Sequence, residues 1–275
     1  MSIGLALAAA FVWGTGDFLG GFATRRAPLL TVMLVSQGVG LAGMAVAAAI
    51  AGGTVTPADL GFGALAGVAG GAGVAMLYRG LAGGTMSLVS PITGVIAVVV
   101  PVVAGVLFGE RPAAVQYGGI AVAVIAVALL SGGPRQRRLD RRSLVLAIGA
   151  GIGFGIFFVA LARTSAAANL WPVVAARGAS VTALVLLSAA LRRAPRVTPA
   201  DARVVVGAGV LDVAANALYL VAVHGGLLSI VAVLASLYPV ATVLCSLLFL
   251  GERLRSAQLA GVAAALGAVV LITAF

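Results

Sequence analysis

The 275-residue chain is poor in charge and contains no lysine. Only 9% of its residues are charged, whereas soluble domains contain about a quarter. Because 62% of the residues are hydrophobic, a soluble fold of this chain could not cover its surface with polar side chains. The scarcity of charge therefore excludes an ordinary soluble protein and favours a protein that is solvated by lipid.

Cysteine and histidine are also almost absent. A single cysteine, Cys245, cannot form an intramolecular disulfide, and a single histidine, His224, cannot build a metal site alone. The chain has no glycine-rich loop with a lysine, so ATP-driven transport by this chain alone is not expected. We expect no cofactor, no metal and no enzymatic activity.

The net charge of +10 comes from arginine alone. In a soluble chain such a charge would suggest binding to nucleic acid. Here the arginines lie between apolar runs, so the expected partner is the anionic surface of a membrane and not a nucleic acid.

Ten apolar runs fill almost the whole chain, and each is close to the roughly 20 residues that a spanning helix needs. The runs cover residues 3–22, 29–51, 60–81, 86–108, 113–130, 144–161, 171–191, 204–223, 227–250 and 257–275. The first run has no basic residue before it, so we interpret it as a retained helix and not as a signal peptide. The sequence predicts an all-α integral membrane protein with ten transmembrane helices.

An internal repeat divides these helices into two sets of five. Gly109-Glu110-Arg111 recurs as Gly251-Glu252-Arg253, at an offset of 142 residues. The same offset relates Ser87 to Ser229 and Gln116 to Gln258. Charged residues are rare here, so a chance repeat of the triplet is improbable. We predict two homologous units, residues 1–131 and 143–275, joined by a basic linker at residues 132–142.

An odd number of helices in each unit requires the two units to have opposite orientations. Loops after the odd-numbered helices contain 14 of the 17 arginines, and loops on the other side contain two. The positive-inside rule places the arginine-rich side in the cytoplasm, so both termini are expected outside an inner cell membrane. The two five-helix units then form an inverted repeat, as in many transporters.

The chain resembles the ten-helix EamA-type branch of the drug/metabolite transporter superfamily. The motifs that carry the resemblance are Phe11-Val12-Trp13-Gly14, Pro91, Pro239 and the two Gly-Glu-Arg triplets, each followed by a Gln-x-x-Gly helix. The resemblance implies secondary active transport of a small molecule, usually export, around a cavity lined by helices 1–4 and 6–9. It also draws attention to Arg177, since the family often has an arginine there; Gln37 occupies the matching place in the first half.

Three ionisable residues lie well inside apolar runs: Asp17, Arg177 and Asp212. Such residues are costly in a bilayer and usually face a cavity or a partner. In a functional interpretation one acid carries a coupling proton, Arg177 contacts an anionic group of the substrate, and Gly14 and Gly16 leave open backbone beside Asp17. In the structural interpretation Arg177 and Asp212 form a salt bridge between adjacent helices.

Polar and aromatic residues near these charges complete a set of candidate substrate contacts. The candidates are Trp13, Asp17, Gln37, Tyr78, Arg177, Asp212, Asn216 and Tyr219. We expect Glu110 and Glu252 to cap helix ends and to pair with neighbouring arginines.

Small residues and prolines predict how the helices pack. Gly63, Gly67 and Gly71 recur every four residues, a spacing that allows close helix approach, and packing within one chain is favoured over dimerisation. Pro91 and Pro239 predict kinks because proline lacks a backbone donor. Both a monomer and a homodimer fit the sequence.

Two functions of other classes fit parts of the sequence. Gly14-Thr15-Gly16-Asp17 matches the Gly-x-Gly-Asp pattern of intramembrane aspartyl proteases, for which Asp212 would be the second acid. Those enzymes, however, have their two catalytic helices in the opposite order and a downstream Pro-Ala-Leu motif that this chain lacks. A membrane receptor or scaffold without transport activity is the third interpretation.

Overall fold

The computed structural model describes residues 1–24, 26–82, 86–131, 141–192, 199–250 and 255–273, and within them the secondary structure is entirely helical. The helices are α1 (Ser2–Thr24), α2 (Leu29–Ala51), α3 (Pro57–Ala82), α4 (Met86–Leu107), α5 (Ala114–Ser131), α6 (Arg141–Ala162), the 3₁₀ helix η1 (Ala166–Ala168), α7 (Trp171–Ala190), α8 (Pro199–His224), α9 (Leu228–Ala235), α10 (Tyr238–Leu250) and α11 (Ser256–Thr273).

These helices account for ten membrane spans. Eight helical stretches are long and apolar enough to cross a bilayer, and one of them combines α9 and α10. Two shorter apolar stretches, Ile92–Leu107 in α4 and Ala114–Leu130 in α5, provide the remaining spans. The fold is therefore the predicted ten-helix membrane protein built from two five-helix repeats.

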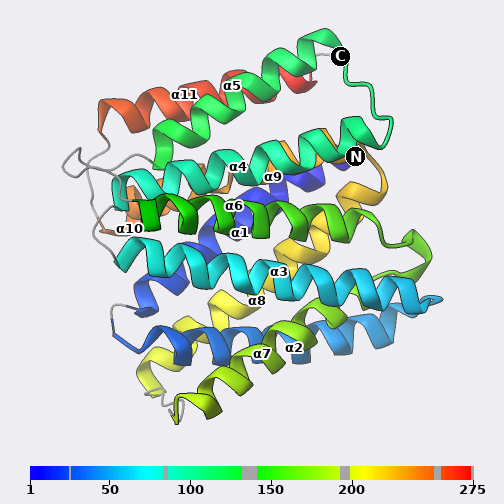
Figure 1. Cartoon of the computed structure of the whole chain (residues 1–275), viewed down its shortest axis with the longest axis vertical. Helices are drawn as coiled ribbons and strands as arrows, with labels where there is room; N and C mark the ends of the chain where they lie inside the picture. The colour runs from blue at the N-terminus through cyan, green and yellow to red at the C-terminus, as the bar shows by residue number, and fades with distance from the viewer. Residues whose placement is uncertain (25, 83–85, 132–140, 193–198, 251–254, 274–275) are drawn as a thin grey trace.

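The helices run back and forth between two ends of the bundle (Figure 1). The N- and C-termini lie at one end, which we call the terminus end. The last residues of α5 and the first residues of α6 lie at the opposite end, which we call the linker end. Because each half crosses an odd number of times, the two halves enter the bundle from opposite ends.

The helices of the two halves alternate around a closed ring. The main contacts around this ring join α1 to α8, α8 to α2, α2 to α7, α7 to α3, α3 to α6, α6 to α4, α4 to α9, and α9 back to α1. Each of these neighbours comes from the other half of the chain. The fifth helix of each half lies outside the ring, where α5 and α11 pack against each other and α5 also contacts α4 (Figure 1).

The predicted ninth helix, residues 227–250, is interrupted in the structure. It forms α9 and α10, which are separated by Ser236 and Leu237. Pro239 explains the break, because it has no N–H for the helical ladder and its ring crowds the carbonyl four residues earlier. By contrast, α4 continues as a helix through Pro91.

Glycine sets the distance between α3 and α7. A Cβ on Gly63 would collide with the carbonyl of Pro172, and a Cβ on Gly67 would collide with the backbone of Ala176. One turn further, Gly71 faces Ser180. The predicted use of this glycine stripe for packing within the chain is confirmed, since all three residues face α7.

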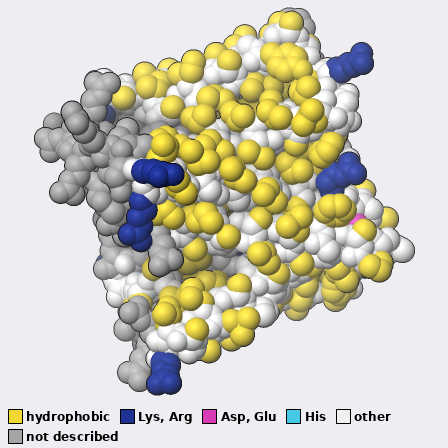
Figure 2. Space-filling model, viewed as in Figure 1, with side chains coloured by type: hydrophobic (Ala, Val, Ile, Leu, Met, Phe, Trp, Pro, Cys, Tyr) yellow, Lys and Arg dark blue, Asp and Glu magenta, His cyan; other side chains and the backbone are white. Residues whose placement is uncertain are grey.

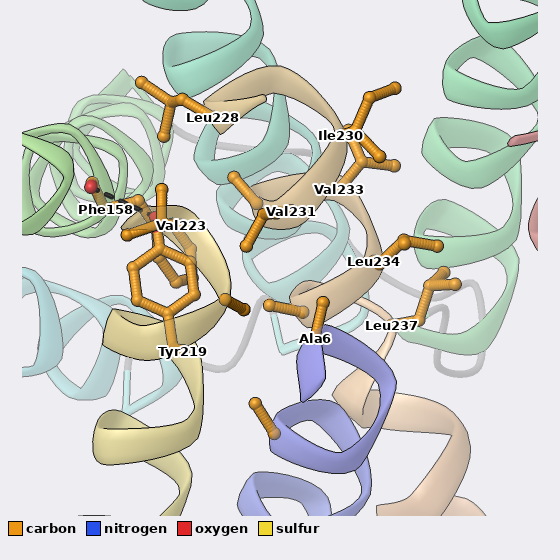
Figure 3. Packing of buried hydrophobic residues seen from close by; sticks show 14 of the residues in the cluster. Ala6, Phe158, Tyr219, Val223, Leu228, Ile230, Val231, Val233, Leu234 and Leu237 are labelled. Atoms are coloured by element: carbon orange, nitrogen blue, oxygen red, sulfur yellow. Dashed lines mark hydrogen bonds between the residues drawn. The ribbon is translucent and has the colours of Figure 1, made fainter. Parts of the chain in front are cut away.

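The outer surface matches a bilayer environment. Hydrophobic side chains cover the middle of the face in Figure 2, and the arginines in this view lie towards the two ends of the bundle. Inside, α9 is buried along its whole length. Leu228, Val231 and Leu234 of α9 belong to the same buried cluster as Tyr219 and Ala6 (Figure 3).

The packing of the ring can be tested at the contact between α3 and α7. We expect Gly67→Val to destabilise the protein by about 1–3 kcal/mol, because the added methyl groups have no space against Ala176. The matched control is Gly61→Val on the same helix, where a Cβ meets nothing within 4 Å. Thermal unfolding in detergent should show a loss for Gly67→Val alone, and equal stability of the two variants would contradict the packing described.

Candidate functional site

Asp212 of α8 is the centre of a polar network inside the ring. Its Oδ2 forms an ion pair with the guanidinium of Arg177 on α7. Its Oδ1 accepts a hydrogen bond from the indole N–H of Trp13 on α1, with a donor–acceptor distance of 3.2 Å. The side-chain amide of Asn216 donates to the Asp212 carbonyl at 2.6 Å. Asp212 thus joins three ring helices, and both of its carboxylate oxygens are engaged.

A second polar contact extends the network to α2. Ser180 lies one turn after Arg177 on α7 and donates its hydroxyl proton to Oε1 of Gln37 at 2.6 Å. The amide N–H groups of Gln37 donate to none of the described residues. The predicted polar residues of α1, α2, α7 and α8 are therefore brought together across both halves, and Gln37 retains donors for a ligand.

Three aromatic rings pack against the indole of Trp13. The Trp13 ring lies 5.8 Å from the ring centroids of both Phe158 and Tyr219, and 6.3 Å from that of Phe157. The hydroxyl of Tyr219 donates to the Phe158 carbonyl at 3.1 Å (Figure 3). Tyr219 is fully buried, so in this conformation it packs against Trp13 and presents no surface to a substrate. Asn216 is almost as buried and acts by orienting Asp212.

Asp17 differs from every other charged residue of the site. It lies one turn from Trp13 on the same face of α1, next to Gly16, which packs against Leu211 and the backbone of Asp212 on α8. Its side chain is exposed, and it forms no hydrogen bond or ion pair with any described residue. Asp17 is thus an acid deep within a membrane span that has no partner in the described part of the chain.

The open backbone near Asp17 does not lie where the sequence predicted it. Gly14 and Gly16 were expected to leave open backbone, and this expectation is wrong. Gly14 packs against the Tyr238 carbonyl and Gly16 packs against α8, so both glycines are sites of helix contact. The open positions lie one turn further along α1, where a Cβ on Gly20 or Gly21 would meet nothing within 4 Å.

The geometry argues against a protease. An aspartyl protease needs two carboxylates that can share a water molecule. Asp212 is held by Arg177, Trp13 and Asn216, which leaves neither of its oxygens free for that purpose. In addition, no cluster of three or more metal-ligating side chains occurs among the described residues.

Two of the sequence predictions lie wholly or partly outside the described residues. The side chain of Tyr78 is not described, nor is Glu252. Glu110 was expected to cap a helix and pair with an arginine. It does cap a helix, but that helix is α9 of the other half, where its carboxylate accepts the N–H groups of Leu228 and Ser229. Backbone amides at a helix N-terminus thus take the place of the arginine.

One group of polar residues at the terminus end was not predicted from the sequence. Asp59, in the first turn of α3, accepts hydrogen bonds from Thr56 and from Ser165, which precedes η1. A signal for it exists in the sequence, because Thr56-Pro57-Ala58-Asp59 recurs 142 residues later as Thr198-Pro199-Ala200-Asp201. This is the same offset that relates the Gly-Glu-Arg triplets.

Comparison with known proteins supports the repeat. A model of the EamA-like transporter family matches residues 1–132 and again residues 141–274. The chain belongs to the EamA-like transporter family. The family consists of transporters and not of enzymes. Membership of this family agrees with the multi-pass bundle described above.

The fold of this EamA-like protein also occurs among solved structures. One crystal structure of a protein aligns with a TM-score of 0.76 over 99% of this chain and 98% of the other. The identity is 18%, so the similarity shows a shared fold alone. A search of curated proteins returned no match.

The stabilising role of the ion pair can be separated from the role of Asp17. We expect Arg177→Gln and Asp212→Asn each to destabilise the protein by about 2 kcal/mol, because each leaves a charge without its partner inside the bundle. The double variant should lose less than the sum of the two. Asp17→Asn should change stability by no more than about 0.5 kcal/mol, because no described partner is lost. Thermal unfolding of the four purified variants measures these differences, and additive losses would show that the pair is not coupled.

Proposed function

We propose that this chain is a secondary active transporter that exports a small metabolite, amino acid or drug by alternating access. The substrate binds inside the ring, against the surface formed by Trp13, Asp17, Gln37 and Arg177. This proposal is supported by the convergence of polar side chains from α1, α2, α7 and α8, since intramembrane polar groups mark substrate and ion pathways.

The observation that carries the proposal is the carboxylate of Asp17, which has no hydrogen-bond or ion-pair partner among the described residues. An ionised acid without a partner is unfavourable at this depth, so Asp17 requires a proton or a cationic group for most of the transport cycle. We propose that Asp17 carries the coupling proton.

Arg177 and Asp212 have a different role in this proposal. The ion pair fixes the orientation of the guanidinium and of Trp13, and only part of the hydrogen-bonding capacity of Arg177 is used. An acceptor group on the substrate can then bind the remaining N–H groups of Arg177 together with the amide of Gln37. The site therefore offers donors on the α2 and α7 side and an acceptor at Asp17 on α1.

Transport can be tested in proteoliposomes. A panel of amino acids, organic cations and organic anions is first screened by thermal shift, and each stabilising compound is then assayed for counterflow and for flux driven by an imposed pH gradient. We expect at least one compound to show saturable counterflow. If no stabilising compound moves across the membrane, the chain acts as a receptor or scaffold.

The assignment of the proton to Asp17 has its own test. We expect Asp17→Asn to reduce gradient-driven flux by at least about tenfold, because an amide at this position cannot exchange a proton. Thr15→Val, two residues away on the same helix, is the matched control and should retain flux. An Asp17→Asn protein that transports normally, with unchanged pH dependence, would exclude Asp17 as the proton carrier.

The orientation in the membrane is part of the proposal. The arginine distribution supports an orientation with the linker end in the cytoplasm and the terminus end outside. A C-terminal fusion to a reporter that is active only outside the cytoplasm should therefore be active in cells. The matched fusion is an insertion of the same reporter in the basic linker, residues 132–142, which should be inactive. Activity of the linker fusion with silence of the C-terminal one would reverse the orientation.

A further inference from the structure

The face of α1 that carries Trp13 and Asp17 looks into the ring. Gly14 packs against the start of α10 and Gly16 packs against α8, and this face lies in the sector between the two contacts. The ring centroid of Trp13 is 6.3 Å from that of Phe157 on α6, a helix that is not next to α1 in the ring. Asp17 lies one helical turn further along the same face. Its exposed side chain therefore borders the interior of the bundle and not the lipid.

The described charges in the middle of the ring do not cancel. Asp212 and Arg177 form an ion pair, so together they carry no net charge. Asp17 has no hydrogen-bond or ion-pair partner among the described residues. An ionised Asp17 is then a negative charge that no described residue compensates, and such a charge is costly inside a membrane. A ligand with a single positive charge would restore neutrality.

Ligands of the other charge classes leave the site charged. An anion would add a second negative charge near Asp17, because Asp212 already compensates Arg177. A zwitterion, such as a free amino acid, has an ammonium for Asp17 and a carboxylate for Arg177, but the site would keep its negative charge. A neutral ligand would keep it as well. The count of charges thus favours a monocation over the other three classes.

The donors of α2 and α7 indicate what else the ligand carries. The side-chain N–H groups of Gln37 donate to none of the described residues. Arg177 has more N–H groups than its ion pair with Asp212 uses. These donors favour a ligand with a hydrogen-bond acceptor. A hydroxyl or a carbonyl oxygen meets that need without the negative charge that a carboxylate would bring.

Beyond Asp17 the same face of α1 is bare. Gly20 and Gly21 lie three and four residues after Asp17, and a Cβ on either would meet nothing within 4 Å. One turn before Asp17 the face carries the indole of Trp13, whose N–H is held by Asp212. A cation on the Asp17 carboxylate therefore has an aromatic ring on one side, which attracts positive charge. On its other side there is room for the body of the ligand.

We propose that Asp17 is the cation subsite of the transport site and that the substrate is an organic monocation. Its charged nitrogen binds the Asp17 carboxylate, and an uncharged acceptor binds Gln37 and Arg177. Gly20 and Gly21 set the size of the body that fits beside the charge. The cation binds the ionised carboxylate, so the protonated form of Asp17 belongs to the state without substrate. This proposal rests on the proposed transport function, but it concerns selectivity, which a comparison of ligands measures.

Four compounds with one skeleton separate the charge classes. Phenylalaninol is a monocation with a hydroxyl acceptor, phenylalanine is the zwitterion, N-acetylphenylalanine is the anion, and N-acetylphenylalaninol is neutral. Each compound is titrated against the purified protein by thermal shift and is then tested for counterflow in proteoliposomes. We expect phenylalaninol to bind at least about tenfold more tightly than the other three, because it alone neutralises Asp17 and engages the donors.

Two substitutions locate the subsite. Asp17→Asn should weaken the binding of phenylalaninol by about tenfold and leave N-acetylphenylalaninol unchanged, a selective loss that a purely structural role of Asp17 would not produce. Gly21→Leu should weaken phenylalaninol by about fivefold. It should leave alaninol unchanged, since alaninol has the same amine and hydroxyl but a methyl group in place of the benzyl group. Gly4→Leu is the matched control on α1, because a Cβ there also meets nothing within 4 Å.

The outcomes distinguish this proposal from the proposed function. If phenylalanine or N-acetylphenylalanine is exchanged and binds as tightly as phenylalaninol, the chain is a transporter and the monocation class is wrong. If phenylalaninol binds with the expected preference but shows no counterflow, the cation subsite is supported and the transport function is not. If neither phenylalaninol nor alaninol stabilises the protein, or if Asp17→Asn keeps the parent preference, Asp17 is not a cation subsite.

Discussion

Polar groups within a bilayer must find partners on neighbouring helices, because lipid provides none, and the rest of this structure depends on that constraint. The ring meets the constraint by placing each of its helices between two helices of the other half. Asp212 can engage Trp13 only because α1 and α8 are neighbours, and Ser180 can reach Gln37 only because α7 lies beside α2. The interleaving of the halves is thus the arrangement that makes a polar interior possible.

The glycines make this interleaving close enough to be stable. Without a hydrophobic force between helices in lipid, packing depends on contact of the backbones themselves. Gly63 and Gly67 bring α3 against α7, and Gly209 brings α8 against Ser36 of α2. Gly14 does the same between α1 and the start of α10. The glycines that allow close packing in this chain therefore lie at contacts between the two halves.

The sequence specified the number of helices and the repeat, because both are properties of spacing that lipid imposes directly. It also indicated Asp17, Arg177 and Asp212, since ionisable residues within apolar runs are conspicuous. It did not specify which helices are neighbours, because contacts such as Trp13–Asp212 join residues 199 positions apart. For the same reason two predictions were wrong: that Glu110 pairs with an arginine, and that Gly14 and Gly16 leave open backbone. The break before Pro239 was anticipated as a kink, but its extent depends on how α9 is buried.

The interleaved ring has a consequence for how the chain is made. The main contacts of α1 are with α8, α9 and α10, and all three helices lie in the second half. At a synthesis rate of roughly 5–20 residues per second, Trp13 waits about 10–40 s before Asp212 is even polymerised. Until then Asp17 has no acidic neighbour on α8, and the glycine faces of α1 and α2 contact lipid or the insertion machinery. The ring can therefore close only after most of the chain has been inserted. Until then the first half lies in the membrane without the helices that it packs against in the folded protein.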